Sequence, residues 1–311
     1  MLFPFLLLLL LLLLPVTESC PACAPLEMDD EINVDMGDID SVPESGLGSS
    51  SEYLGSGKMF DTISPFYDLT NTLFTFNLDS TWRELLVSKT LGGNDGWMYD
   101  IDVLDVATGT CEVIKTLLNT PTKISSVTGI DPSLGMLEKC SDKLSSFETP
   151  IKLINDDVTT QTFSKKFTHT LVSFGIRNIP NRESALCNIR KHTVSPSTDE
   201  TCTEPGRLGI LEVSYKPTFV SDVTVESLGL TTPLKLLTSY FIHYLVPSIA
   251  YVANGFKNYE QYVHLVDSLE SFPKDFEREV EGLECEGGRW RVEEVEERNF
   301  GSIKVYTFVA V

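Results

Sequence analysis

The stretch DIDVLDVATGTCEVIKTLL, residues 100–118, decides the fold class. An apolar run of strand length leads into a tight turn of small residues, and an apolar helical pattern follows. This order is typical of the first unit of a parallel sheet that binds its ligand at the turn. A dinucleotide loop needs G-x-G-x-x-G, but counting from Gly109 places Cys111 and Ile114 at the other two glycine positions. The motif therefore disfavours NAD and FAD.

Seven apolar runs predict strands, and helix-length segments separate the first five of them. The expected strands are residues 101–107, 124–130, 151–154, 169–174, 207–213, 289–297 and 302–311. Alternating strands and helices predict an α/β fold, with a Rossmann-like, mostly parallel sheet covered on both faces. The last two runs are separated only by RNFG, so they predict an antiparallel hairpin at the sheet edge.

The composition divides the chain into three parts. Residues 1–24 hold an apolar core that is shorter than a membrane span and read as a signal peptide or signal anchor. Residues 25–57 contain no Lys or Arg and read as an acidic, flexible linker. Residues 58–311 form the globular domain, with an apolar, aromatic helical insertion over 228–272 that we expect to cap the substrate. The uncharged part of this insertion, residues 236–253, approaches the length of a membrane span, but Pro247, His243 and several hydroxyls favour a buried helical pair.

Charge and cysteine content restrict the partners and the cross-links. The formal net charge of −21 would repel phosphate backbones, so we expect no nucleic-acid partner. Seven cysteines at scattered spacing do not suggest a disulfide framework, and we interpret the CPAC stretch at residues 20–23 as incidental. No cluster of metal-ligating residues is visible, so we expect no metal.

Polar residues just after the strands indicate the ligand. Asp131 follows the second strand, where a carboxylate can accept hydrogen bonds from both hydroxyls of a ribose. Asp156 and Asp157 follow the third strand and would lie beside an adenine. A loop without the glycines that a pyrophosphate needs suits an adenosine joined to a small zwitterion, which describes S-adenosylmethionine. Alternatively, Asp131 or Ser133 is only a helix cap, and Asp156 and Asp157 only a solvated turn.

Several longer motifs resemble the ubiquinone/menaquinone biosynthesis C-methyltransferase family. They are MFDTISPFYDLTNTLFTFNLDSTWRELL, VLDVATGTCE, GIDPSLGMLEKC, LVSFGIRNIPNRESAL, GILEVSYKP and YFIHYLVPSIAYVANGFKNYEQYVHLVDSLESFP, in the family's order. The resemblance covers roughly residues 58–311. It implies the class I methyltransferase fold, S-adenosylmethionine as methyl donor, and a prenylated benzoquinol or naphthoquinol as acceptor.

The resemblance also implies roles for individual residues. It places Thr110 and Asp131 on the donor and Asp156 and Asp157 at the adenine edge, with Ser173 at the end of the fourth strand. Asp105 and Gly109 complete the donor signature. The family usually has glycine where Cys111 stands. A small side chain is tolerated there if the backbone keeps φ below zero, and this is the conformation we expect.

Methylation of a ring carbon requires removal of the phenolic proton and stabilisation of the resulting charge. We expect Arg177, in SFGIRN, to stabilise the phenolate or to orient a water, although a strand-end Arg can instead form a salt bridge. Candidate bases are His243, Tyr240 and Asp68. The aromatic residues around Tyr240 would receive the isoprenoid tail or, equally well, fill a core.

Two other functions remain open at this stage. One is a methyltransferase that acts on another lipophilic acceptor, such as a sterol or tocopherol precursor. The other is a non-catalytic paralogue that binds donor or quinone and acts as a scaffold. The leader predicts an organelle or endomembrane location, with the plastid favoured and the mitochondrion as the alternative. Expected partners are the prenylated quinol, a membrane surface reached through the substrate tail or the leader, and a quinone-biosynthesis complex.

Overall fold

The computed structural model describes residues 57–75, 77–92, 100–196, 204–214, 239–253 and 272–311, with residues 236, 263, 266, 268 and 269. Every described residue belongs to one compact unit of the chain. The predicted leader and nearly all of the predicted linker lie outside the described residues.

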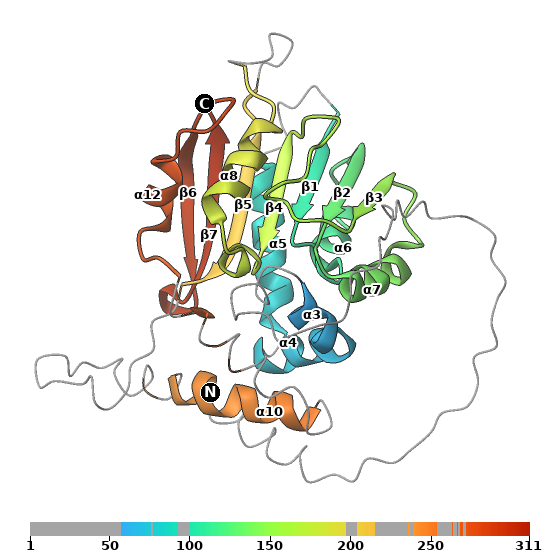
Figure 1. Ribbon diagram of the computed structural model, residues 1–311, viewed down its shortest axis with the longest axis vertical. Coiled ribbons are helices and arrows are strands. Elements are labelled where there is room, and N and C mark those ends of the chain that lie inside the picture. Colours follow the sequence, from blue (N-terminus) through green and yellow to red (C-terminus); the bar gives the residue numbers. More distant parts are fainter. Residues whose placement is uncertain are drawn as a thin grey trace, which may run out of the picture. The chain divides into compact units, whose positions relative to one another are not determined.

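Seven strands form one sheet in the order β3-β2-β1-β4-β5-β7-β6 (Figure 1). They are β1 (Asp102–Val106), β2 (Ser126–Ile130), β3 (Ile151–Ile154), β4 (His169–Ser173), β5 (Arg207–Val213), β6 (Trp290–Arg298) and β7 (Ile303–Ala310). The first five are parallel, and β7 pairs antiparallel with both β5 and β6. The predicted sheet with its C-terminal antiparallel hairpin is confirmed.

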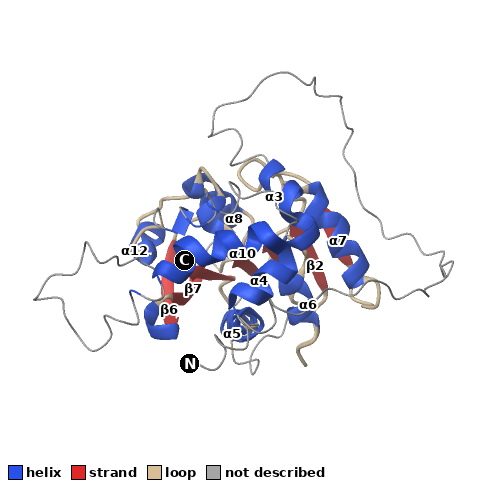
Figure 2. Cartoon of the chain, turned by 90° about the horizontal axis from the view of Figure 1, so that it is seen from below, coloured by secondary structure: helices blue, strands red, loops and turns tan. Residues whose placement is uncertain are grey.

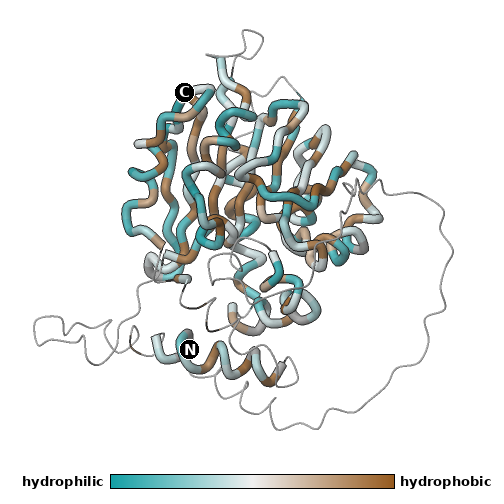
Figure 3. The backbone as a smooth tube through the Cα atoms, in the orientation of Figure 1, coloured by the Kyte–Doolittle hydropathy of each residue, from teal (hydrophilic) through white to brown (hydrophobic). Residues whose placement is uncertain are grey.

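Helices cover both faces of the sheet because its central strands are apolar on both sides. In β1, Val103 belongs to the core on one face and Leu104 to the core on the other. The first core also includes residues of α5 (Leu78–Leu91), α6 (Glu112–Leu118) and α7 (Leu134–Leu144). The second includes residues of α8 (Arg182–Lys191) and α12 (Phe276–Glu281). Figure 3 shows apolar backbone segments recurring along the central strands.

Short helices lie beyond the carboxyl ends of the parallel strands, and Figure 2 views them from that side. They are α3 (Lys58–Ile63), η1 (Ser64–Phe66), α4 (Tyr67–Thr75), the π-helical turn η5 (Phe241–Leu245) and α10 (Val246–Ala253). Two further turns, η2 (Ile176–Asn178) and η6 (Asn299–Gly301), follow β4 and β6. Within the described part of the chain, no helix combines the length and apolar character that a membrane span needs.

The connection from β3 to β4 differs from the prediction. Residues 155–168 are all described and contain no helix, although the alternation of strands and helices predicted one. Asp157 begins a turn instead: its Oδ1 accepts a hydrogen bond from Thr159 N at 2.8 Å, and its carbonyl accepts one from Gln161 N at 3.0 Å. Side-chain bonds to the nearby backbone compete with helix formation. The segment has the length of a helix but lacks an apolar face.

The structure contains two disulfides, which the scattered spacing of the cysteines did not suggest. Cys111, at the start of α6, is bonded to Cys140 on α7, and Cys187 on α8 is bonded to Cys285 in the loop before β6. Their Cα atoms lie 5.0 Å and 4.9 Å apart. The partners are 29 and 98 residues apart in the chain, so spacing alone could not pair them. The three other cysteines lie outside the described residues.

Candidate active site

A cleft with about 730 Å³ of empty space lies at the carboxyl ends of the parallel strands. Its floor is formed by residues that follow β1, β2 and β4, including Gly109, Asp131 and Phe174. Phe60 of α3 and Tyr67 of α4 contribute the opposite wall. The cleft is therefore where a doubly wound sheet is expected to hold its ligand.

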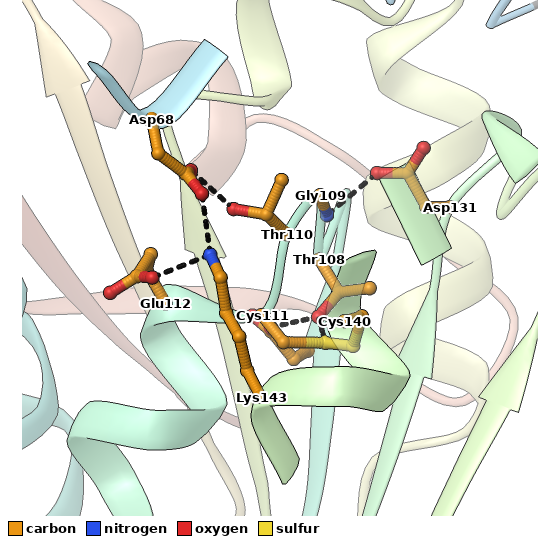
Figure 4. The surroundings of a disulfide bond; sticks show 10 residues. Asp68, Thr108, Gly109, Thr110, Cys111, Glu112, Asp131, Cys140 and Lys143 are labelled. Carbon is orange, nitrogen blue, oxygen red and sulfur yellow. Dashed lines mark hydrogen bonds and ion pairs between the residues drawn. A yellow bond between two sulfur atoms is a disulfide. The ribbon is translucent and has the colours of Figure 1, made fainter. Parts of the chain in front are cut away.

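The loop after β1 is tightly tied to its neighbours (Figure 4). Gly109 has φ 55°, a left-handed conformation that favours glycine, and its N–H donates a hydrogen bond to Asp131 Oδ2 at 2.8 Å. The hydroxyl of Thr110 donates to Asp68 Oδ1 on α4 at 2.6 Å. Both predicted loop residues thus lie at the cleft side of the fold, although only Gly109 lines the cleft itself.

Our prediction for the backbone of Cys111 is wrong. Its φ is 64°, so the position requires the left-handed region that glycine normally occupies. A residue with a Cβ is disfavoured there and persists only when its surroundings hold it. The disulfide to Cys140 supplies a covalent restraint of that kind.

Asp131 is buried in the cleft wall with both carboxylate oxygens engaged. Oδ2 accepts the bond from Gly109 N, and Oδ1 accepts one from Ser133 N at 2.8 Å. Burial raises the pKa of Asp131 to about 6, and the two backbone N–H donors oppose that rise. Of the two candidate helix caps, Ser133 is the cap, because its Oγ accepts a hydrogen bond from Met136 N at the start of α7. Asp131 itself faces the cleft.

Asp105 lies in β1, beneath the same loop. Its Oδ2 accepts a hydrogen bond from the Thr108 hydroxyl. Burial raises the pKa of Asp105 to about 7, the Thr108 bond opposes the rise, and the charge of Asp131 adds to it. A ligand that carries positive charge would stabilise the carboxylate form.

The remaining predicted donor residues all line the cleft. Asp156 and Asp157 lie after β3, and Ser173 is the last residue of β4. Asp156 is exposed and accepts a hydrogen bond from Asp157 N at 2.7 Å. The structure therefore brings Gly109, Asp131 and these three residues around one space.

Arg177 forms a buried ion pair and does not line the cleft. Its Nη1 lies 2.7 Å from Glu212 Oε2, and the two side chains are 7% and 0% exposed. Nη1 also donates to the Phe174 carbonyl at 3.2 Å, and Nε donates to Ser268 Oγ at 3.2 Å. The structure thus shows the salt bridge that the sequence analysis gave as the alternative for Arg177. If Arg177 influences a methyl acceptor in the cleft, it does so electrostatically.

Asp68 is engaged in a charge network behind the donor loop. Lys143 Nζ of α7 lies 2.6 Å from Asp68 Oδ2 and 2.6 Å from Glu112 Oε1 of α6 (Figure 4). With its other oxygen bound to Thr110, Asp68 joins α4 to the loop. It does not line the cleft, so a role as base is not supported by its position.

His243 and Tyr240 lie near the start of the α10 segment and do not line the cleft either. Tyr240 is 44% exposed and stacks on Tyr244, with ring centroids 5.6 Å apart. Tyr244 and Val252 are 60% and 51% exposed. The interpretation of this stretch as a buried helical pair is therefore wrong for its described aromatic side chains, which face outward.

The sequence reasoning missed Tyr67 and Asn178, which both line the cleft. Burial raises the pKa of the Tyr67 phenol, while its hydrogen bond to Asn71 and the charge of Arg177 lower it. Arg177 thus acts electrostatically on a cleft hydroxyl. The YDLTN motif that carries Tyr67 was visible, but only its Asp68 was singled out.

The cleft suits S-adenosylmethionine chemically. Within the described structure, Ser173 Oγ at the cleft is buried without a hydrogen-bond partner, which leaves a polar atom for a ligand or a water to satisfy. Asp105 Oδ1 is also buried without a partner, but Asp105 does not line the cleft. Asp131 presents a carboxylate to the cleft, as recognition of ribose hydroxyls requires. Among the described residues, no group of three or more His, Cys, Asp or Glu side chains could hold a metal ion.

Fold and site together define a methyltransferase that uses S-adenosylmethionine. The chain belongs to the ubiE/COQ5 methyltransferase family, whose model matches residues 49–302. The ubiquinone/menaquinone biosynthesis C-methyltransferase UbiE of Geotalea daltonii is 30% identical over 221 residues, which are 70% of this chain and 80% of that protein. The demethylmenaquinone methyltransferase of Chlamydia caviae is 28% identical over 220 residues, 70% and 81% of the two chains.

Solved structures with a similar fold are more distant. An S-adenosylmethionine-dependent methyltransferase from Clostridium acetobutylicum has a TM-score of 0.46 and 10% identity, over 79% of this chain and 97% of that one. The [4+2]-cyclase SpnF has a TM-score of 0.49 and 13% identity, over 85% and 98%.

Proposed function

We propose that the chain methylates a ring carbon of a prenylated quinol in ubiquinone, menaquinone or phylloquinone biosynthesis. The observation that carries the proposal is the cleft itself. Residues at the strand ends, Gly109, Asp131 and Ser173, line the cleft, and the half-buried Tyr67 of α4 lines it as well. A donor half and an aromatic acceptor half therefore share one space. The names of the relatives support a quinol as the acceptor.

The donor half is assigned as follows. Asp131 accepts hydrogen bonds from the ribose hydroxyls, and Asp156 and Asp157 lie at the adenine edge. Gly109 lets the backbone approach the ligand, while Thr110 fixes the loop through Asp68. Asp105 and Ser173 offer their unpartnered oxygens to the donor's ammonium group or to a water between them. No metal is part of this assignment.

When bound, S-adenosylmethionine supplies an electrophilic methyl group on its sulfonium. The protein must align the quinol ring with that methyl group and stabilise negative charge on the phenolic oxygen. The Arg177–Glu212 pair holds a guanidinium next to the Phe174 carbonyl, close enough to lower the pKa of Tyr67. Tyr67 can then donate a hydrogen bond to the phenolate. His243 and Tyr240 stay predictions for the base.

Methyl transfer to demethyl-quinols tests this function directly. The full chain in detergent micelles should transfer one methyl group to a ring carbon of a prenylated benzoquinol, naphthoquinol or both, as mass spectrometry of the product shows. The matched control is the corresponding quinol that already carries a methyl group at that ring carbon, which should accept none. Micromolar donor binding without transfer to either quinol would favour a sterol or tocopherol precursor. No binding at millimolar donor would favour the scaffold.

A membrane surface is the partner that the exposed face of the α10 segment supports best. Tyr240, Tyr244 and Val252 on this segment and Leu69 on the contacting helix α4 are 44%, 60%, 51% and 53% exposed. Aromatic side chains with a polar tip suit the boundary between lipid and water. A substrate with an isoprenoid tail would be extracted from such a surface. A quinone-biosynthesis complex is the further partner we propose.

We propose an organelle or endomembrane location, with the plastid favoured over the mitochondrion. The apolar leader and the acidic tract behind it motivate this, and two disulfides are in keeping with a compartment that permits their formation. A fluorescent protein fused to residues 1–57 should leave the cytosol, and the same fusion without residues 1–24 should remain there. A diffuse cytosolic signal from the first fusion, or clean mitochondrial import, would contradict the proposal.

A further inference from the structure

We propose that the Cys111–Cys140 disulfide is a redox-controlled clamp on the donor loop, so that the oxidised protein binds the methyl donor and the dithiol form binds it less tightly. The inference rests on the proposed donor site. It concerns a cysteine that stands where the resembling family usually has glycine.

The disulfide joins the two segments that shape the donor half of the cleft. Cys111 ends the loop that begins after β1, two residues beyond Gly109. Cys140 lies on α7, the helix that begins at Leu134, just after Asp131. The hydrogen bond from Gly109 N to Asp131 Oδ2 spans the same two segments. The Lys143–Glu112 ion pair also joins α7 to α6, at 2.6 Å, so the disulfide adds a covalent link to polar ones (Figure 4).

The disulfide matters for the loop because the backbone of Cys111 has an unfavourable conformation. A left-handed φ of 64° is disfavoured for a residue with a Cβ and needs a restraint. The hydrogen bond from Cys111 N to the Thr108 carbonyl, 2.9 Å, is one such restraint and is independent of sulfur chemistry. The carbonyl of Cys111 also accepts a hydrogen bond from Lys115 N at 2.9 Å, and the disulfide adds a covalent restraint. Without it, Cys111 can move toward negative φ, which shifts the Gly109 N–H away from Asp131.

Reduction is a balanced exchange. A dithiol reductant, either a protein dithiol or dithiothreitol, donates two electrons and two protons. The sulfur–sulfur bond of the clamp breaks, two thiols form at Cys111 and Cys140, and the reductant becomes a disulfide. The exchange at the clamp needs no other oxidant or reductant.

Because both cysteines are buried, reduction of the disulfide should depend on whether the methyl donor is bound. Cys111 and Cys140 are 0% exposed, so a reductant reaches them only when the loop opens. A bound donor holds the loop closed and should slow reduction. Thermodynamic linkage requires the converse, because a ligand that prefers the oxidised form also stabilises it. A roughly tenfold difference in donor affinity corresponds to a shift of about 30 mV in the midpoint potential of the disulfide.

The second disulfide is a natural control. Cys187 and Cys285 join α8 to the loop before β6, both are partly accessible, and neither lines the cleft. Its reduction should leave the donor loop unchanged. The variant Cys187→Ser/Cys285→Ser therefore isolates the response of the clamp.

The test measures donor affinity by calorimetry on the full chain, oxidised and after reduction with dithiothreitol. We expect reduction to weaken S-adenosylmethionine binding roughly tenfold in the native protein and in Cys187→Ser/Cys285→Ser. Cys111→Gly/Cys140→Ala restores a residue that accepts positive φ and lacks the disulfide, so its affinity should not respond to reductant. Alkylation followed by mass spectrometry should show donor slowing the appearance of thiols at Cys111 and Cys140.

Equal donor affinity of the oxidised and reduced native protein, with complete reduction verified by alkylation, would overturn the clamp and leave the proposed function intact. Free thiols at Cys111 and Cys140 in protein purified without reductant would also overturn it. If neither form binds the donor, the proposed function fails and the clamp fails with it.

Discussion

Asp131→Ala should reduce the affinity for S-adenosylmethionine by about 2 to 4 kcal/mol, roughly 30- to 700-fold, because two charge-assisted hydrogen bonds to the ribose are lost. The buried carboxylate also holds Gly109 N and Ser133 N, so its removal loosens the loop at the same time. Calorimetry on the folded variant measures the effect. Asp100→Ala, an exposed carboxylate just ahead of β1 and outside the cleft, is the matched control.

The same site should make donor binding depend on pH. The pKa of Asp131 is raised to about 6, so its carboxylate becomes protonated as the pH falls through that value, and acceptors for the ribose are lost. Donor affinity should therefore fall between pH 7 and pH 5. Asp105, with a pKa of about 7, titrates in the same window and adds to the slope. Native donor affinity in a folded Asp131→Ala protein would rule out the ribose assignment.

Glu212→Gln should lower the free energy of unfolding by about 3 to 5 kcal/mol, because it leaves the buried Arg177 guanidinium without its counter-charge. Glu212 is fully buried, and its carboxylate also accepts hydrogen bonds from the backbone N–H groups of Arg177 and Val213. A domain with ordinary stability of about 5 to 15 kcal/mol would lose a large part of it. Denaturant unfolding followed by fluorescence measures the change.

Glu293→Gln is the control for charge loss at the surface. Glu293 pairs with Arg207 at 2.9 Å, and their side chains are 37% and 22% exposed. Exposed pairs of this kind contribute about 0 to 1 kcal/mol. Restoring neutrality with Arg177→Met/Glu212→Gln should recover part of the lost stability. Equal decreases in the free energy of unfolding for Glu212→Gln and Glu293→Gln would contradict the assignment of a buried ion pair.

The sheet could be predicted from the sequence because each strand is a local apolar run. The runs at residues 151–154 and 207–213 coincide with β3 and β5. In β5, residues 208–212 are all buried, so the strand is covered on both faces. The strand ends then located Asp131, Asp156 and Ser173 at the cleft. Site residues that depend only on their position after a strand were accessible to the same reasoning.

Features that depend on three-dimensional contacts could not be predicted from the sequence. The pairing of Cys111 with Cys140 follows from the packing of α6 against α7, and their separation of 29 residues in the sequence does not predict it. The partner of Arg177, in η2, is Glu212 on β5, 35 residues further along the chain. The expected helix after β3 was inferred from length alone, and the turn at Asp157 replaced it. Tyr67 reaches the cleft because α4 crosses the strand ends, which no local pattern reveals.

The two ends of the described domain lie toward opposite ends of the strands. Gly57 forms part of the cleft rim, whereas Val311 follows β7, which is antiparallel to β5, and the C mark in Figure 1 lies far from α3. Val311 is also fastened by its two backbone hydrogen bonds to Arg289, at 2.8 Å and 3.0 Å. For immobilisation on a sensor chip, attachment beyond Val311 leaves the cleft open to solution, whereas a tag fused directly ahead of Gly57 would stand at its entrance.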